Sequence, residues 1–314
     1  MPLAAPSLRL ETEQGFRLVR LANSNVELTV IPELGAKIGS LRDVGSDREW
    51  LWRPPGPLRL FRNAPGDSFA HGTLLGADEC LPTIGACTVG GRQLPDHGEA
   101  WSQAWQLDTE ALAQNVILTS LELPDSSLAI QRTVSLDGPV VTLDYVLHNR
   151  SAERQPFIWA LHPLLSYVTG DRLHLPTEVD QVRVELSSRA DSPPGASWAW
   201  PSPRADMYLS SLNLGAGEAY AKFFTARLQV GEARIENPQT GDRLVVRWPA
   251  AALPYAGIWV TRGGWRGAHH PAIEPTNAPH DVLADALREP PPELFIEAAG
   301  TRRWSVQLES SSVR

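Results

Sequence analysis

The sequence contains very few cysteines. Only Cys80 and Cys87 occur among its 314 residues. Two cysteines cannot build a disulfide framework, and they are too few for a zinc site made of cysteine alone. We therefore expect buried thiols in a reducing cytoplasm, with a single bridge between the two cysteines as the alternative.

Long apolar runs and an excess of basic residues are also absent. No uncharged run is long enough to cross a bilayer. The opening residues MPLAAPSLRLETEQGF lack the basic and apolar regions of a signal peptide, which favours a cytoplasmic location. The formal net charge of -8 provides no attraction to nucleic acid or to an anionic membrane surface. We expect neither as a partner.

Familiar catalytic motifs are missing as well. The sequence has no G-x-S-x-G elbow, no P-loop, no dinucleotide-binding fingerprint and no H-E-x-x-H zinc motif. An acyl-transfer enzyme or a cofactor-driven enzyme therefore has little support, and we expect no cofactor.

What the sequence does contain is alternation of apolar and polar residues, which is typical of half-buried strands. Segments with this pattern are 25–31, 115–123, 128–136, 140–149, 233–248, 257–261 and 302–309. Turn signals such as Asp137-Gly138-Pro139 separate them. Only PHDVLADAL, residues 279–287, has helical spacing. Many short strands without alternating helices predict an all-β protein with an antiparallel sandwich or barrel.

We find no clean domain boundary and expect a single domain over residues 1–314. The most loop-like stretch is 189–206, which is rich in proline and also contains Trp198 and Trp200. Two tryptophans make a solvated linker improbable. We expect a long loop that packs over something else.

A few polar residues occur in unusual surroundings. In LPDHGEAW, His97 stands between Asp96 and Glu99, and His162 stands in the apolar run FIWALHPLL. Glu274 stands in PAIEPTNAP, and Asp206 follows the tryptophan-containing loop. A histidine or glutamate in an apolar strand must find a partner or shift its pKa. Each residue alone fits a structural role, but together they predict an imidazole acid and a carboxylate base in one cavity.

Several of these segments, in this order, resemble the aldose 1-epimerase (galactose mutarotase-like) family nearly end to end. The matching segments are VELTVIPELGAKIGSLRD, GADECLPT, PDHGEAW, WALHPLL, LPYAGIWVTRGGW, AIEPTNAPHDVL and GTRRWSVQLE. The sequence departs from the family at Ala36, where a second glycine is usual, and after His162-Pro163, where many members have an aromatic pair.

The resemblance implies a large twisted antiparallel β-sandwich with a sugar cleft and minor short helices. It also implies interconversion of the α and β anomers of a hexose by ring opening and closing. His162 would be the acid that protonates the ring oxygen, and Glu274 the base that deprotonates the anomeric hydroxyl. His97 and Asp206 would bind the sugar. We add Trp259, or Trp198 or Trp200, as the aromatic residue that stacks on the sugar.

Opening a cyclic hemiacetal requires one proton to be delivered and one to be removed, without metal or redox chemistry. Histidine and a buried carboxylate suit this task. The expected partner is a small sugar, an aldohexose or possibly a sugar phosphate. The acidic Asp96 next to His97 favours an unphosphorylated sugar. The basic residues Arg62, Arg262 and Arg266 leave a sugar phosphate as the alternative. We expect a monomer or a homodimer.

Two other functions remain open. The first is a metal-dependent, cupin-like isomerase, because HHPAIE places His269 and His270 close to Glu274, with His280 following. Adjacent histidines on a strand point to opposite faces, which argues against joint ligation. The second is a carbohydrate-binding protein on the same fold without turnover, since a fold does not determine a function.

Overall fold

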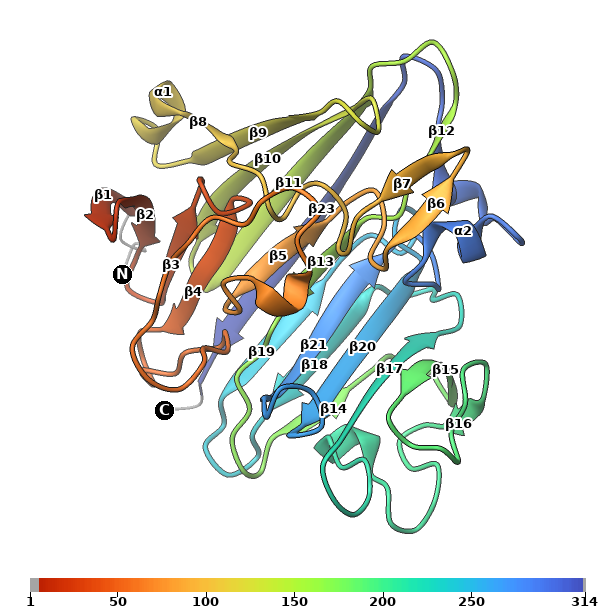
Figure 1. The fold of residues 1–314 in the computed structure, drawn as a ribbon. Coiled ribbons are helices and arrows are strands. Elements are labelled where there is room, and N and C mark those ends of the chain that lie inside the picture. The colour runs from red at the N-terminus through yellow and green to blue at the C-terminus, as the bar shows by residue number, and fades with distance from the viewer. Residues whose placement is uncertain (1–5, 313–314) are drawn as a thin grey trace.

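The computed structural model describes residues 6–312 and consists mainly of two large antiparallel sheets (Figure 1). The larger sheet has eleven strands. In spatial order they are β1 (Ser7–Glu13), β2 (Phe16–Ala22), β3 (Val26–Ile31), β4 (Lys37–Asp43), β5 (Ala77–Cys80), β13 (Ala160–Pro163), β21 (His269–Thr276), β20 (Tyr255–Arg262), β17 (Ala219–Thr225), β15 (Gln181–Ser187) and β16 (Ser197–Ala199).

The second sheet has eight strands, and two small antiparallel pairs of strands lie outside both sheets. The eight strands are β14 (Arg172–His174), β18 (Glu232–Glu236), β19 (Arg243–Arg247), β23 (Thr301–Ser311), β11 (Val140–Asn149), β10 (Leu128–Asp137), β9 (Ile117–Leu123) and β8 (Gln106–Asp108). The small pairs are β6 (Cys87–Val89) with β7 (Arg92–Leu94), and β12 (Gln155–Pro156) with β22 (Phe295–Ile296).

Helices are short. The α-helices are α1 (Thr109–Leu112) and α2 (Leu283–Ala286), and the 3-10 helices are η1 (Phe69–His71), η2 (Leu209–Ser211) and η3 (Pro292–Leu294). In the part of the chain that the structure describes, no helix is long and apolar enough to cross a membrane.

The all-β prediction is confirmed, and the alternating segments form strands β3, β9, β10, β11, β18, β19, β20 and β23. The turn at Gly138 joins β10 to β11, and the helical pattern forms α2. The prediction for residues 189–206 was incomplete, because part of this loop forms the edge strand β16 against β15. Trp198 on this strand is buried, with its ring centroid 5.9 Å from that of Phe223.

The core lies between the two sheets because alternate residues on each strand point toward the other sheet. Leu161, Ile258 and Ile273 belong to this layer, and complete burial of such a side chain is worth about 1.5–3 kcal/mol. One buried carboxylate, that of Glu79, also points inward and accepts hydrogen bonds from Arg132 and Tyr145. Its neighbour Asp78 therefore points to the opposite face of the large sheet, where the cavity described below lies.

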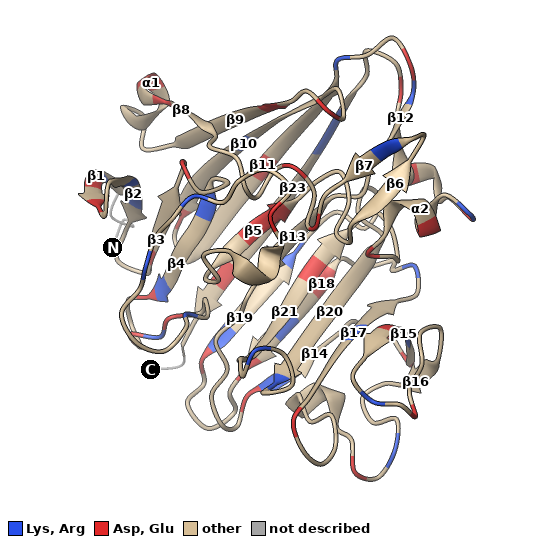
Figure 2. Ribbon diagram, viewed as in Figure 1, with Lys and Arg blue, Asp and Glu red and all other residues tan. Residues whose placement is uncertain are grey.

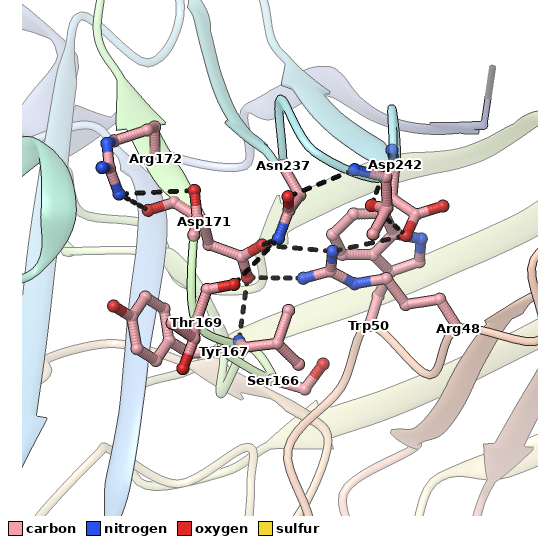
Figure 3. A network of polar contacts seen from close by, with 12 residues as sticks. Arg48, Trp50, Ser166, Tyr167, Thr169, Asp171, Arg172, Asn237 and Asp242 are labelled. Carbon is pink, nitrogen blue, oxygen red and sulfur yellow. Dashed lines mark hydrogen bonds and ion pairs between the residues drawn. The ribbon is translucent and has the colours of Figure 1, made fainter.

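A buried polar network joins three distant segments (Figure 3). The Arg48 guanidinium contacts the Asp171 carboxylate at 2.5 and 3.2 Å, and the Asn237 amide donates to the same carboxylate at 3.0 Å. The Arg48 guanidinium also lies 3.9 Å from the ring centroid of Trp50. The network ties the segment after β4 to the start of β14 and to the turn between β18 and β19.

Both cysteines are free thiols, so the alternative of a bridge between them is wrong. Cys80 is buried on β5, and burial raises the pKa of its thiol. Figure 2 shows that charged residues are sparse on the central strands and more frequent on loops and strand ends. The few charged residues on the central strands are therefore candidates for a functional site.

Candidate active site

A row of polar residues crosses the centre of the large sheet on the face away from the second sheet. His162 on β13 pairs directly with Asp78 on β5, and Gly257 on β20 pairs with Glu274 on β21. The pairs that flank His162 and Glu274 place these two residues opposite each other as well. Lys37 at the start of β4 extends the row, because its ammonium contacts the Asp78 carboxylate. Cross-strand register therefore brings an imidazole between two buried carboxylates.

His162 and Glu274 are in contact. Nε2 of His162 lies 3.4 Å from Oε1 of Glu274, and both side chains are almost fully buried. Burial, and then the positive charge of nearby groups including His97, holds the pKa of His162 well below its usual value. Burial also raises the pKa of Glu274, although Lys222 opposes this shift. The resting pair therefore has a neutral imidazole next to a buried carboxylate that is also in contact with the Lys222 ammonium.

Lys222 on β17 reaches Glu274 diagonally across β20. Its ammonium contacts Oε2 of Glu274 and lies 3.4 Å from Oδ1 of Asp281. Gly257 makes this approach possible, because a Cβ there would lie only 3.1 Å from Cε of Lys222 and 2.9 Å from the ring of Phe224. Burial disfavours the charge of Lys222, but the carboxylates of Asp281 and Glu274 raise its pKa overall. The Lys222 ammonium thus forms ion pairs with two buried carboxylates.

His97 is held in one orientation by its neighbours. Its Nδ1 lies 2.8 Å from Oδ1 of Asp96, and its ring stacks on Phe69 with centroids 3.8 Å apart. Because the hydrogen bond with His97 and other contacts lower the pKa of Asp96 despite its partial burial, the carboxylate is an acceptor and Nδ1 is the donor. Nε2 is then free for a ligand.

The backbone around His97 explains the glycine in its motif. His97 has a φ of 59° and Gly98 a φ of 73°, both in the left-handed region. A Cβ at Gly98 would lie 2.1 Å from the carbonyl oxygen of Leu81, so a side chain there cannot be accommodated. The turn places the His97 ring edge-on to the ring of His162, with centroids 5.1 Å apart.

These residues surround a cavity of about 370 Å³, within the range typical of small-molecule sites. His97, His162 and Lys222 line one part of it. Trp259 and Tyr220 line another part, and their rings stack with centroids 5.4 Å apart. The floor is formed by central strands, and the walls by loops.

The structure brings four of the predicted site residues together and places Asp206 apart. His97, His162 and Trp259 line the cavity, whereas Glu274 is fully buried beneath it, behind His162 and Lys222. The prediction for Asp206 is wrong. Its side chain is 58% exposed in a loop outside the cavity, and its carboxylate lies 2.9 Å from the guanidinium of Arg204.

The other aromatic candidates do not reach the cavity either. Trp198 is buried in the core, and Trp200 packs against the same cluster. The exposed Arg62, Arg262 and Arg266 are absent from the cavity lining. Lys222, which is already paired, is the cation that lines it.

Sequence reasoning missed Lys222 and Asp281. Asp281 lies within AIEPTNAPHDVL and lines the cavity, and its carbonyl oxygen accepts from the amides of Ile84 and Gly85 at 2.9 and 2.6 Å. A signal for Lys222 was present in AYAKFFT, where a lysine interrupts an apolar strand. Such a lysine needs a buried carboxylate partner.

The geometry of β21 argues against His269 and His270 as ligands of one metal ion. His269 is exposed, and His270 is buried on the opposite face of β21, as expected for neighbours on a strand. Within residues 6–312, no group of three or more His, Cys, Asp and Glu side chains is arranged to hold a metal ion.

Comparisons with known proteins define the fold. No family model matches the chain, and no curated protein matches its sequence. Among solved structures, a galactose mutarotase-like protein from Clostridium acetobutylicum matches with a TM-score of 0.71 at 15% identity, covering 98% of this chain and 99% of that one. A galactose mutarotase related enzyme from Lactobacillus acidophilus matches with a TM-score of 0.67 at 14% identity, covering 94% and 97%.

A third structure, of a candidate aldose 1-epimerase from Escherichia coli K12, matches with a TM-score of 0.65 at 15% identity, covering 98% of this chain and 100% of that one. The chain has a galactose mutarotase-like fold. The resemblance seen in the sequence motifs therefore extends to structural neighbours across the whole chain.

Proposed function

We propose that this protein is an aldose 1-epimerase, which interconverts the α and β anomers of a sugar by opening and closing its ring. The observation that carries the proposal is the contact of His162 with Glu274 at the edge of the cavity, with His97 beside them. The reaction needs one group that removes a proton and one that delivers it, and these residues supply both.

The geometry favours roles that differ from those implied by the resemblance. Glu274 is closed off from the cavity, and burial holds His162 neutral. In our proposal His162 takes the proton of the anomeric hydroxyl, and the Glu274 carboxylate stabilises the imidazolium that forms. His97 acts as the imidazolium: Nδ1 keeps its proton in the hydrogen bond with Asp96, and Nε2 gives its proton to the ring oxygen as the C1–O5 bond breaks.

Closing the ring reverses both transfers. After rotation about the C1–C2 bond, the new hydroxyl returns its proton to His97, while the His162 imidazolium protonates the carbonyl oxygen. Every proton returns to its starting group, so no co-reactant is consumed. Because Lys222 is neutralised by two carboxylates, the site favours an unphosphorylated sugar.

One observation favours a second function, a carbohydrate-binding protein without turnover. Lys222 occupies Oε2 of Glu274, which reduces the basicity of that carboxylate. Polarimetry with freshly dissolved α-anomers of several aldoses separates the two functions. An aldose 1-epimerase accelerates the approach to anomeric equilibrium, whereas a binding protein leaves the spontaneous rate unchanged and still binds the sugar in calorimetry.

A further inference from the structure

One edge of the large sheet ends in an unusually long strand. The strand order places β1 and β16 at the edges of this sheet, and β14 and β8 at the edges of the second sheet. The strands β8, β14 and β16 have three residues each, whereas β1 has seven. In the part of the chain that the structure describes, β1 pairs with β2 alone, so its outer edge presents free backbone N–H and C=O groups (Figure 1). Proteins usually keep such an edge short or covered, because it can pair with another chain.

The strand β1 continues the inner face of the large sheet but lacks its cover. Its residues are exposed except for Leu8, which is partly buried. Leu10 pairs with Val19 of β2 and faces the same side, and Val19 is fully buried in the core between the sheets. Leu10 is nevertheless 51% exposed. The inner face of the sheet therefore ends in an apolar side chain that the described residues leave half open to solvent.

The opposite face of β1 carries charges of both signs. Arg9, Glu11 and Glu13 alternate along the strand with the inward-facing residues. Arg9 lies opposite Arg20 of β2, a like charge, and Arg20 forms its ion pair with Glu11 at 2.8 Å. Like charges directly opposite each other destabilise a pair of strands. The guanidinium of Arg9 is therefore better matched by a carboxylate that approaches from the open edge.

The sequence of β1 is complementary to itself in the antiparallel direction. When two copies pair about a two-fold axis at Leu10, Arg9 of each copy lies opposite Glu11 of the other. The two Leu10 side chains then meet, and the whole of β1 is paired. Residues directly opposite each other share a face, so the leucines extend the inner face and the two ion pairs lie on the outer face.

Charge disfavours the two neighbouring registers. Side chains alternate between the faces, so the axis moves in whole residues if the inner faces of both copies are to stay on one side. An axis at Arg9 places two arginines opposite each other, and an axis at Glu11 places two glutamates opposite each other. These registers also shorten the paired segment to residues 7–11 or 9–13. The register with the axis at Leu10 is therefore the favoured one.

We propose that β1 is a dimerisation strand, which pairs antiparallel with β1 of a second copy of this chain and joins the two large sheets into one. Backbone hydrogen bonds along the strand supply the attraction, and the charges set the register. The same surface is used by both copies, so pairing consumes both long edges and leaves only the short β16 at each end of the joined sheet. The assembly therefore stops at a dimer. A single pair of strands buries a small area, so the dimer should form in a concentration-dependent way.

Analytical ultracentrifugation of the full chain over about 1–200 µM protein tests the proposal. We expect the wild-type protein to shift from monomer toward dimer as its concentration rises. Hydrogen exchange, measured at both ends of this range, should slow at the outward-facing amides of β1 when the dimer forms. A protein that stays monomeric throughout, or a dimer with unchanged exchange in β1, overturns the proposal.

Charge reversal tests the register. Arg9→Glu alone, or Glu11→Arg alone, turns both ion pairs into pairs of like charge, so each change should weaken dimerisation roughly tenfold or more. The two variants should form a heterodimer when mixed, because an acidic β1 then faces a basic one. The double variant R9E/E11R exchanges the two charges and should recover the wild-type dimer.

Asp144→Arg is the matched control for these reversals. Asp144 is an exposed carboxylate on β11, a strand that is paired on both sides by β10 and β23, so its reversal should leave dimerisation unchanged. Circular dichroism and thermal unfolding establish that each variant is folded. A dimer that survives both single reversals, or a mixture of the two that stays monomeric, would show that the copies do not pair through β1 in this register and would overturn the proposal.

Discussion

The imidazole of His162 and the carboxylate of Glu274 lie opposite each other on adjacent strands, with Nε2 and Oε1 3.4 Å apart. Only the imidazole lines the cavity. In the proposed mechanism the carboxylate therefore acts on a ligand through the imidazole, an arrangement that resembles the orienting carboxylate of a catalytic triad.

Glu274→Gln should lower the rate of mutarotation by about 10²–10⁴-fold. Glutamine keeps the size and the hydrogen bonding of glutamate, but it cannot stabilise an imidazolium. Polarimetry gives the rate, and calorimetry should show sugar affinity close to that of the wild type. Full activity of this variant would remove Glu274 from the mechanism.

His162→Asn and His97→Asn should both lower kcat. In the proposed mechanism His162 takes one proton and His97 delivers the other, so the loss of either imidazole removes a proton transfer, while asparagine keeps some of its hydrogen bonding to the sugar. A direct sugar titration is needed beside the kinetics, because KM reports binding only when chemistry is slow. An unchanged kcat in either variant would remove that histidine from proton transfer.

Lys222→Met should move the acidic limb of the pH–rate profile to higher pH. Lys222 lowers the pKa of Glu274 against the effect of burial, so removing the ammonium should keep Glu274 protonated to a higher pH. The variant also leaves a buried carboxylate unpaired, which costs stability. Lys222→Met combined with Glu274→Gln is the control, since it should recover stability without recovering activity. An unshifted acidic limb in a folded Lys222→Met protein would contradict the coupling.

His270 should make the protein less stable as the pH falls. Its pKa is about 4 in the folded state and 6.5 as the reference value, so the unfolded state binds more protons between these values. The free energy of unfolding therefore falls as pH drops from about 6.5 toward 4, by on the order of 3 kcal/mol for this group. Urea unfolding at several pH values should show a shallower dependence for His270→Gln. Parallel curves for the two proteins would exclude the effect.

Asp171→Ala should lower the free energy of unfolding by about 3–5 kcal/mol, because it leaves the buried Arg48 guanidinium without its main partner. Urea unfolding measures the loss. None of the network residues lines the cavity, so the fraction that remains folded should keep the wild-type rate of mutarotation. A loss smaller than 1 kcal/mol would show that solvent replaces the pairing.

Much of the fold could be predicted because strands bury alternate residues, and this leaves a period of two in segments such as 128–136. The proximity of His97, His162 and Glu274 could be expected because polar residues in apolar or turn-rich segments are unusual, and the structure places them side by side. Asp206 was misplaced because a proline-rich loop has no periodicity that fixes the direction of a side chain. The pairing of Lys222 with two carboxylates could not be predicted, because it depends on how β17, β20, β21 and the loop with Asp281 are arranged in space. A local sequence pattern contains no information about that arrangement.

The residues around the cavity lie partly on strands and partly on loops, and these two groups should differ in how easily they change during evolution. His162, Glu274 and Lys222 sit on central strands, where an insertion of one residue would exchange the two faces of the sheet, as the neighbours Asp78 and Glu79 illustrate. Trp265 and Asp281 instead lie on connections outside the strands, which tolerate change in length. Under the proposed function, changes in the loops can alter which sugar is recognised while the groups proposed for proton transfer stay fixed on the strands.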